Sequence, residues 1–122
     1  MSRPLVAYLP LLVVHWIADF VLQTHWQATN KSKNNVALSH HVLVYTACLG
    51  AVSALLFGPG RLWLLFVAGN GLLHFVTDYC TSRVSSRLYA KQDWHNFFVV
   101  VGFDQVIHQL CLAATMSLAF YR

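Results

Sequence analysis

Residues 4–22 read PLVAYLPLLVVHWIADFVL, an apolar stretch interrupted only by His15 and Asp19. A helix of about 20 apolar residues is long enough to cross the hydrocarbon core of a bilayer. Three comparable stretches follow, so that the candidate spans are residues 4–22, 37–57, 62–80 and 97–121. The sequence therefore predicts an all-α fold, a four-helix transmembrane bundle whose helices run up, down, up and down.

The composition of the chain agrees with a membrane protein. Of its 122 residues, 57% are hydrophobic and only 10% are charged, whereas about a quarter of the residues of a soluble domain are charged. Arg3 and the apolar residues after it resemble a signal peptide, but no small-residue cleavage pattern follows, and Asp19 is foreign to such a peptide. We predict that the whole chain, residues 1–122, is one integral-membrane domain.

The polar connections between the predicted spans differ in length. Gly58-Pro59-Gly60 is short enough to form only a turn, which predicts a tight antiparallel hairpin of the second and third helices. The cluster of asparagine and lysine in residues 23–36 predicts a polar loop, whereas residues 81–91 have the spacing of a helix lying at the membrane surface. The two longer connections, 23–36 and 81–96, are therefore expected at the same end of the bundle.

The basic residues are divided unequally between the two ends of the predicted bundle. Because cytoplasmic loops are richer in lysine and arginine, we expect the long connections in the cytoplasm and both termini outside. The net charge of +4 is spread over loops and ends, so no nucleic-acid partner is expected. The long connections carry Lys31, Lys33, Arg83, Arg87 and Lys91, and the opposite end carries Arg3, Arg61 and Arg122.

Three of the four acidic residues, Asp19, Asp78 and Asp104, fall inside predicted spans. Without a partner, each would cost on the order of 3 kcal/mol at the centre of a transmembrane helix. Each has a histidine four residues away, in a position that shares its helix face. The pairs are His15 with Asp19, His74 with Asp78, and Asp104 with His108.

These polar stripes extend along the predicted helices. Gln23 prolongs the stripe of the first helix and Asn70 that of the third, while His41, Tyr45 and Cys48 follow one another at helical spacing on the second. Because charged side chains avoid lipid, the stripes should face one another. The sequence therefore predicts one polar cluster in the cytoplasmic half of the membrane.

Imidazole and carboxylate groups that converge from several helices are typical ligands of a divalent metal, with Zn favoured and Mn or Fe also suitable. We expect His15, His74 and His108 to supply nitrogen ligands to one ion or two, with the aspartates ligating or accepting the second ring N–H. A metal with an open position activates water. The candidate ligands are His15, Asp19, His41, His74, Asp78, Asp104 and His108.

The function that follows is a metal-dependent hydrolase acting on a lipid or another membrane-borne substrate, with Asp78 or Asp104 as the catalytic general base. Two other interpretations stay open. Buried His/Asp pairs can fix which helices pair, in a non-catalytic protein that assembles with itself or with another membrane protein. Titratable side chains within a membrane also form ion or proton pathways.

Other polar residues have simpler interpretations. His40 and His41 are close to the predicted interface, where surface histidines need no special role. Asn70 and Gln105 are expected to form hydrogen bonds between helices.

Three segments of the chain also resemble a known family. They are HWIADFVLQT (15–24), LLHFVTDYC (72–80) and FDQVIHQL (103–110), and a histidine pair opens the helix after the first. Together they resemble a domain-of-unknown-function family of small integral-membrane proteins of bacteria and their phages. The resemblance covers nearly the whole chain and implies a bacterial inner-membrane location but no activity. In that membrane, the termini that the charge balance places outside are expected in the periplasm. A weaker similarity to membrane-bound metal-dependent hydrolases favours an enzyme by analogy.

Overall fold

The computed structural model describes residues 3–121, and within that range it contains helices and no strands. Five α-helices and one π-helical segment follow one another, which confirms the all-α class. Arg122, which entered the sequence-based charge balance, lies outside the described residues. The elements are α1 (Arg3–Trp16), η1 (Ile17–Val21), α2 (His25–Asn30), α3 (Asn35–Phe57), α4 (Arg61–Ala90) and α5 (Trp94–Phe120).

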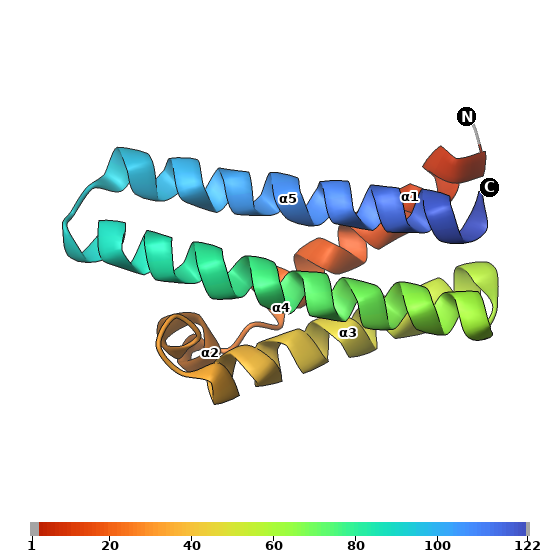
Figure 1. Cartoon of the computed structure of the whole chain (residues 1–122), viewed down its shortest axis with the longest axis horizontal. Coiled ribbons are helices and arrows are strands. Elements are labelled where there is room, and N and C mark those ends of the chain that lie inside the picture. The colour runs from red at the N-terminus through yellow and green to blue at the C-terminus, as the bar shows by residue number, and fades with distance from the viewer. Residues whose placement is uncertain (1–2, 122) are drawn as a thin grey trace.

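The four long helices α1, α3, α4 and α5 run alternately toward opposite ends of the molecule (Figure 1). The start of α1 and the end of α5 lie at the same end of the molecule as the α3–α4 turn, and α2 lies at the other end with the α4–α5 connection. Three segments in the described range are long and apolar enough to cross a membrane, namely Arg3–Val21, Asn35–Phe57 and Trp94–Phe120. Helix α4 is not among them, because Asn70, His74 and Asp78 lower its hydropathy.

The connection at residues 23–36 is not the plain polar loop that the sequence predicted, because it contains helix α2. Thr24 Oγ1 accepts a hydrogen bond from the Gln27 N–H at 3.2 Å, and Gln27 Oε1 accepts one from the Thr24 N–H at 3.0 Å. This reciprocal capping box starts a helix even when only six residues follow. Helix α2 packs against α3 and covers one end of the bundle.

The other two connections agree with the sequence. Helix α3 ends at Phe57 and α4 begins at Arg61, so the glycine and proline residues between them form a short turn in which Gly58 has φ of 77°. Residues 81–90 are helical, as predicted, and they continue α4 without a break; their location at the membrane surface stays a prediction. Helix α5 begins after Asp93, whose carboxylate accepts hydrogen bonds from the side chain and the backbone N–H of Asn96; these bonds lower the pKa of the Asp93 carboxyl.

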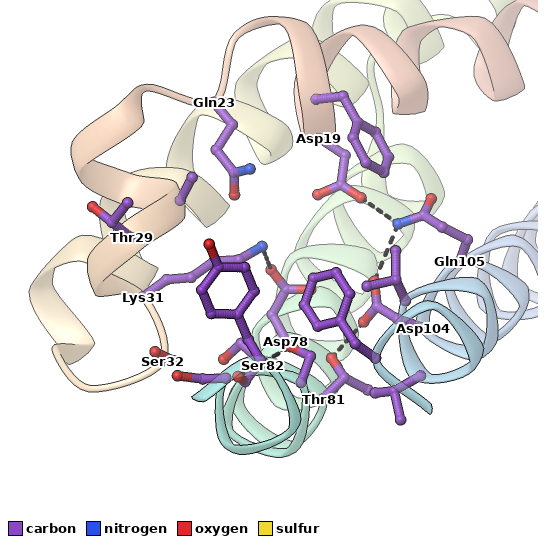
Figure 2. Close-up of a pocket in the computed structure, with 18 residues that line it drawn as sticks. Asp19, Gln23, Thr29, Lys31, Ser32, Asp78, Thr81, Ser82, Asp104 and Gln105 are labelled. Carbon is purple, nitrogen blue, oxygen red and sulfur yellow. Dashed lines mark hydrogen bonds and ion pairs between the residues drawn. The ribbon is translucent and has the colours of Figure 1, made fainter. Parts of the chain in front are cut away.

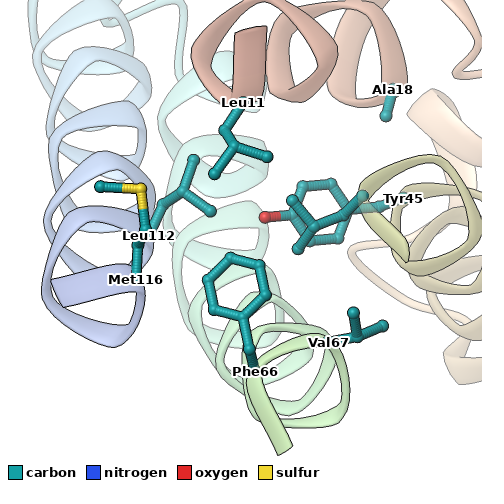
Figure 3. Packing of buried hydrophobic residues seen from close by; sticks show 8 residues of the cluster. Leu11, Ala18, Tyr45, Phe66, Val67, Leu112 and Met116 are labelled. Carbon is teal, nitrogen blue, oxygen red and sulfur yellow. The ribbon is translucent and has the colours of Figure 1, made fainter. Parts of the chain in front are cut away.

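Apolar side chains fill the interior of one half of the bundle and also cover the outside of the molecule. Leu11, Leu49, Phe66 and Leu112 are among the residues of the buried apolar cluster (Figure 3). At the same time, large hydrophobic side chains are exposed on all four long helices, up to 88% for Leu55. Such an outer surface is suited to contact with lipid rather than with water.

Helices α3 and α4 approach each other closely at Gly71. A Cβ atom added to Gly71 would lie 2.7 Å from Thr46 Oγ1, whereas one added to Gly69 would have no neighbour within 4 Å among the described residues. Small residues at contacts between transmembrane helices allow the backbones to approach. This close packing brings the polar faces of α3 and α4 together.

Candidate metal centre

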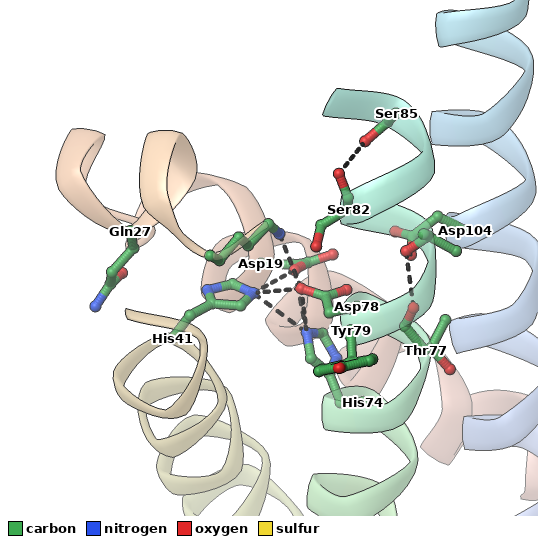
Figure 4. A network of polar contacts seen from close by, with 12 residues as sticks. Asp19, Gln27, His41, His74, Thr77, Asp78, Tyr79, Ser82, Ser85 and Asp104 are labelled. Atoms are coloured by element: carbon green, nitrogen blue, oxygen red, sulfur yellow. Dashed lines mark hydrogen bonds and ion pairs between the residues drawn. The ribbon is translucent and has the colours of Figure 1, made fainter. Parts of the chain in front are cut away.

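The structure brings the predicted polar residues of four helices into one cluster (Figure 4). Asp19, His41, His74 and Asp78 are no more than 3% exposed, and the Asp104 side chain is 14% exposed. Burial of several ionisable groups at one place is costly unless they are paired or bind an ion. All seven candidate ligands lie in or beside this cluster, and they are His15, Asp19, His41, His74, Asp78, Asp104 and His108.

Four of these side chains surround a common point. Asp19 Oδ1 lies 2.9 Å from His41 Nε2 and 3.3 Å from His74 Nε2. Asp78 Oδ2 lies 3.3 Å and 3.6 Å from the same two nitrogens, which are 3.2 Å apart. Ligands at about 2.0–2.2 Å from a tetrahedral ion are about 3.3–3.6 Å from one another. Five of the six distances among these four atoms are therefore compatible with a site of two nitrogen and two oxygen ligands, and the shortest of them are also those of hydrogen bonds.

A second group lies beside the first and shares Asp19 with it. Asp19, Asp104 and His108 each offer one ligand atom, and these atoms lie within 4.8 Å of one another. Gln105 Nε2 donates to Asp19 Oδ2 at 2.9 Å and to Asp104 Oδ2 at 3.1 Å, and it therefore joins the two carboxylates. Asp78 contacts histidines of both groups. Its Oδ1 lies 3.0 Å from His108 Nε2, and its Oδ2 faces His41 and His74.

The local structure of the first segment decides where Asp19 lies. Asp19 belongs to η1, a π-helical turn in which the Leu22 N–H donates to Ile17 O at 2.9 Å. The sequence predicted a regular helix with Asp19 paired to His15, but these side chains are 3.6 Å apart, and Asp19 lies closer to His41. A π-helical turn changes the direction of the side chains that it carries, and such turns are frequent at functional sites.

The shortest His/Asp contacts join different helices. The three pairs predicted within helices have separations of 3.6 Å, 3.6 Å and 3.4 Å, for His15/Asp19, His74/Asp78 and Asp104/His108 respectively. His41 to Asp19 is 2.9 Å and His108 to Asp78 is 3.0 Å. The carboxylates thus interact most closely with histidines of neighbouring helices.

His15 and His41 differ from their sequence-based interpretation. His15 Nε2 lies 3.2 Å from Gln105 Oε1, and among the described residues His15 belongs to neither candidate ligand group. His41 is 0% exposed, so the interpretation as a surface histidine is wrong for His41, while it holds for His40, which is exposed. Asn70 and Gln105 form the expected interhelical hydrogen bonds, Asn70 with Thr115 at 2.8 Å.

A cavity of about 620 Å³ opens beside the cluster (Figure 2). Asp19, Asp78 and Asp104 line it, and Lys31 Nζ donates to Asp78 Oδ2 at 2.8 Å. The cavity wall contains both hydroxyl groups and apolar side chains. The hydroxyl groups belong to Thr29, Ser32, Thr81, Ser82, Ser85, Ser86 and Tyr89, and the apolar side chains are those of Phe20, Ala28, Phe97, Val100 and Val101.

Sequence reasoning missed Lys31 and Ser82. Lys31 is brought to Asp78 by the fold of α2 over the bundle end, a contact between residues 47 positions apart that no local pattern reveals. Ser82 could have been identified from the sequence, because it continues the stripe of Asn70, His74 and Asp78 by one more helical turn.

The comparisons with known proteins assign no activity to this arrangement. No curated protein and no solved structure matches the chain. A family model matches residues 7–121, and the chain therefore belongs to DUF3307, a family described as proteins of unknown function.

Proposed function

We propose that the protein is a membrane-embedded, metal-dependent hydrolase whose ion is held by Asp19, His41, His74 and Asp78. The observation that supports this most strongly is that five of the six distances between their two nitrogens and two oxygens are 2.9–3.6 Å, close to the spacing of ligands around a tetrahedral ion. Two carboxylates and two imidazoles in this geometry favour Zn, and Mn or Fe accept the same donors. A dication would also balance the charge of the two buried carboxylates.

In this proposal α4 is the fourth membrane span. Leu62, Leu65, Leu72 and Val76 are exposed on α4 and would face lipid, whereas its polar residues face the bundle interior. The bundle then crosses a bacterial inner membrane four times. The surplus of basic residues at the α2 end favours the cytoplasmic side for the cavity and the periplasm for both termini.

Asp78 and Asp104 have different tasks in this centre. Asp78 is fully engaged with His41, His74 and His108, so it acts as a ligand rather than as a base. Asp104 is more exposed, lines the cavity, and is oriented by hydrogen bonds from Gln105 and Thr81. Four protein ligands fill a tetrahedral ion, so the water would have to bind as a fifth ligand, where the ion would activate it for attack on the substrate. Asp104 would accept the proton that the water loses and would return it to the leaving group.

The metal is tested by elemental analysis of detergent-purified protein, with His41→Ala compared with His40→Ala. The two histidines are neighbours, but only His41 contacts the cluster. We expect stoichiometric metal in the wild type and in His40→Ala, and at least a 100-fold loss of affinity in His41→Ala, because removal of one of four ligands leaves an incomplete site.

Hydrolysis is tested with labelled phospholipids and polyprenyl-linked lipids. Asp104→Asn is expected to keep the metal and to lose turnover by about 100-fold or more, since a general base contributes about that much. A folded wild type without metal would contradict the proposal and would favour the non-catalytic interpretation, in which the His/Asp pairs hold the helices together. Metal without turnover of any lipid would contradict the hydrolase alone.

A further inference from the structure

We infer that the cavity beside the metal centre binds a phosphate group, with Lys31 and Ser82 as the residues that recognise it. The inference rests on the proposed function, because it requires the ion. The inference concerns the substrate rather than the ion. Lys31 and Ser82 line the cavity and are not among the four proposed metal ligands.

The first support is a pair of polar atoms that lack a partner. Ser82 is 7% exposed and lines the cavity, yet its Oγ has no hydrogen-bond partner within residues 3–121; the same holds for the buried Oε1 of Gln23. Buried polar groups are nearly always hydrogen-bonded in native proteins. Figure 2 shows Gln23 and Ser82 at the cavity on either side of Lys31. A ligand with several oxygen atoms would satisfy the Ser82 hydroxyl, and rotation of the Gln23 amide would let its NH₂ donate as well.

The second support is the chemistry of the surrounding side chains. Among the described residues, Lys31 is the one basic residue that lines the cavity, and the hydroxyl groups of Ser32, Ser82 and Ser86 line it as well. An ammonium group together with hydroxyl donors is a common way to bind a phosphate, whose oxygens accept several charge-assisted hydrogen bonds.

The third support is the position of Lys31 relative to the proposed ion. Lys31 Nζ is bonded to Asp78 Oδ2, the same oxygen that faces His41 and His74. A metal ion bound to Asp78 Oδ2 would repel the ammonium group of Lys31 and would neutralise the carboxylate to which Lys31 is bonded. Lys31 is then free to reach a ligand in the cavity. Without the ion, the three carboxylates that line the cavity repel an anion, so phosphate binding has to depend on the metal.

The shape of the cavity favours a lipid as the source of the phosphate. Its volume of about 620 Å³ is within the usual range of about 300–1,000 Å³ for small-molecule sites. Apolar side chains, among them Phe20, Val100 and Val101, line it together with the hydroxyl groups. A lining of both kinds suits an amphiphilic molecule with a phosphate head and a hydrocarbon chain.

The experiment measures binding of radiolabelled orthophosphate by equilibrium dialysis to full-length protein in phosphatidylcholine nanodiscs. The protein carries the metal that it retains after desalting, and a second sample is stripped with a chelator. We expect binding by the metal-loaded sample only, weakened about tenfold or more by Lys31→Met and by Ser82→Ala, as for the loss of a hydrogen bond to a charged group. Lys33→Met and Ser117→Ala, at exposed positions away from the cavity, serve as matched controls and should bind as the wild type does.

A second arm identifies the source of the phosphate. Phosphatidic acid added to the nanodiscs should displace the label if the ligand is a lipid headgroup, whereas retained label would support the phosphate site with a soluble ligand. Metal-loaded wild type that binds neither phosphate nor phosphatidic acid would overturn the inference and leave the metal centre in place. Equal binding by Lys31→Met, Ser82→Ala and their controls would also overturn it. Elemental analysis of the same samples shows whether the proposed function itself has failed.

Discussion

The two halves of the bundle are built from the same four helices but are held together differently. Toward the α3–α4 turn, Leu11, Phe66, Leu112 and Met116 pack in an apolar cluster (Figure 3), and isolated hydrogen bonds such as that of Asn70 with Thr115 join the helices there. Toward α2, the helices are joined by a connected set of His/Asp contacts and hydrogen bonds around Asp19 and Asp78 (Figure 4). Lipid is as apolar as leucine, so the first half depends on close packing.

Tyr45 lies at the boundary between the two halves. It belongs to the buried apolar cluster, and its ring also stacks on that of His74 with centroids 4.0 Å apart. The polar half depends on particular partners at particular distances, whereas the apolar half depends mainly on complementary shape. The difference suggests that substitutions in one half should change properties that substitutions in the other half leave intact.

The largest effect is expected from Asp78→Asn, which removes a carboxylate that contacts three histidines and Lys31. Thermal unfolding followed by circular dichroism, with and without zinc, measures it. A bound metal at 100 times its Kd stabilises the wild type by about 2.7 kcal/mol, and Asp78→Asn should lose this increase in Tm. Asp93→Asn, in the α4–α5 connection, should retain it. An equal zinc-dependent increase in both variants would contradict the metal centre.

The next effect is expected from Leu112→Ala in the apolar half. Leu112 is 0% exposed, and its truncation leaves a cavity that should cost about 2 kcal/mol, at the low end of the range for such changes because lipid can also solvate leucine. Unfolding by sodium dodecyl sulfate measures the loss, with Leu110→Ala, at a position 64% exposed, as the control. The metal content should be unchanged. A folded Leu112→Ala protein without metal would show that the halves are not independent.

A smaller effect is expected at the contact that joins α3 to α4. Gly71→Ala places a methyl group against Thr46 and should destabilise the bundle by about 1–2 kcal/mol through overpacking. Gly69→Ala adds the same group in open space, where the better helix propensity of alanine should leave stability equal or raise it by up to about 1 kcal/mol. The same unfolding assay compares them. If Gly71→Ala were as stable as Gly69→Ala, close backbone approach would not hold these helices together.

The sequence predicted the helices well because hydropathy is a local property. The segments 4–22 and 37–57 correspond closely to Arg3–Val21 and Asn35–Phe57, and 62–80 lies within α4. The candidate residues could be found because charged groups inside apolar helices must face one another. Helix α2 could also have been recognised, since Thr24 and Gln27 have the spacing of a capping box.

The amino-acid sequence by itself determined which segments are helical and which side chains cannot face lipid, because both follow from the polarity of neighbouring residues. Only the tertiary structure decided the partners of those side chains. The π-helical turn at Asp19, the buried position of His41 and the approach of Lys31 to Asp78 each depend on how distant segments pack. Spacing along one helix identifies a polar face, but the distances that distinguish a metal site from paired side chains arise between helices.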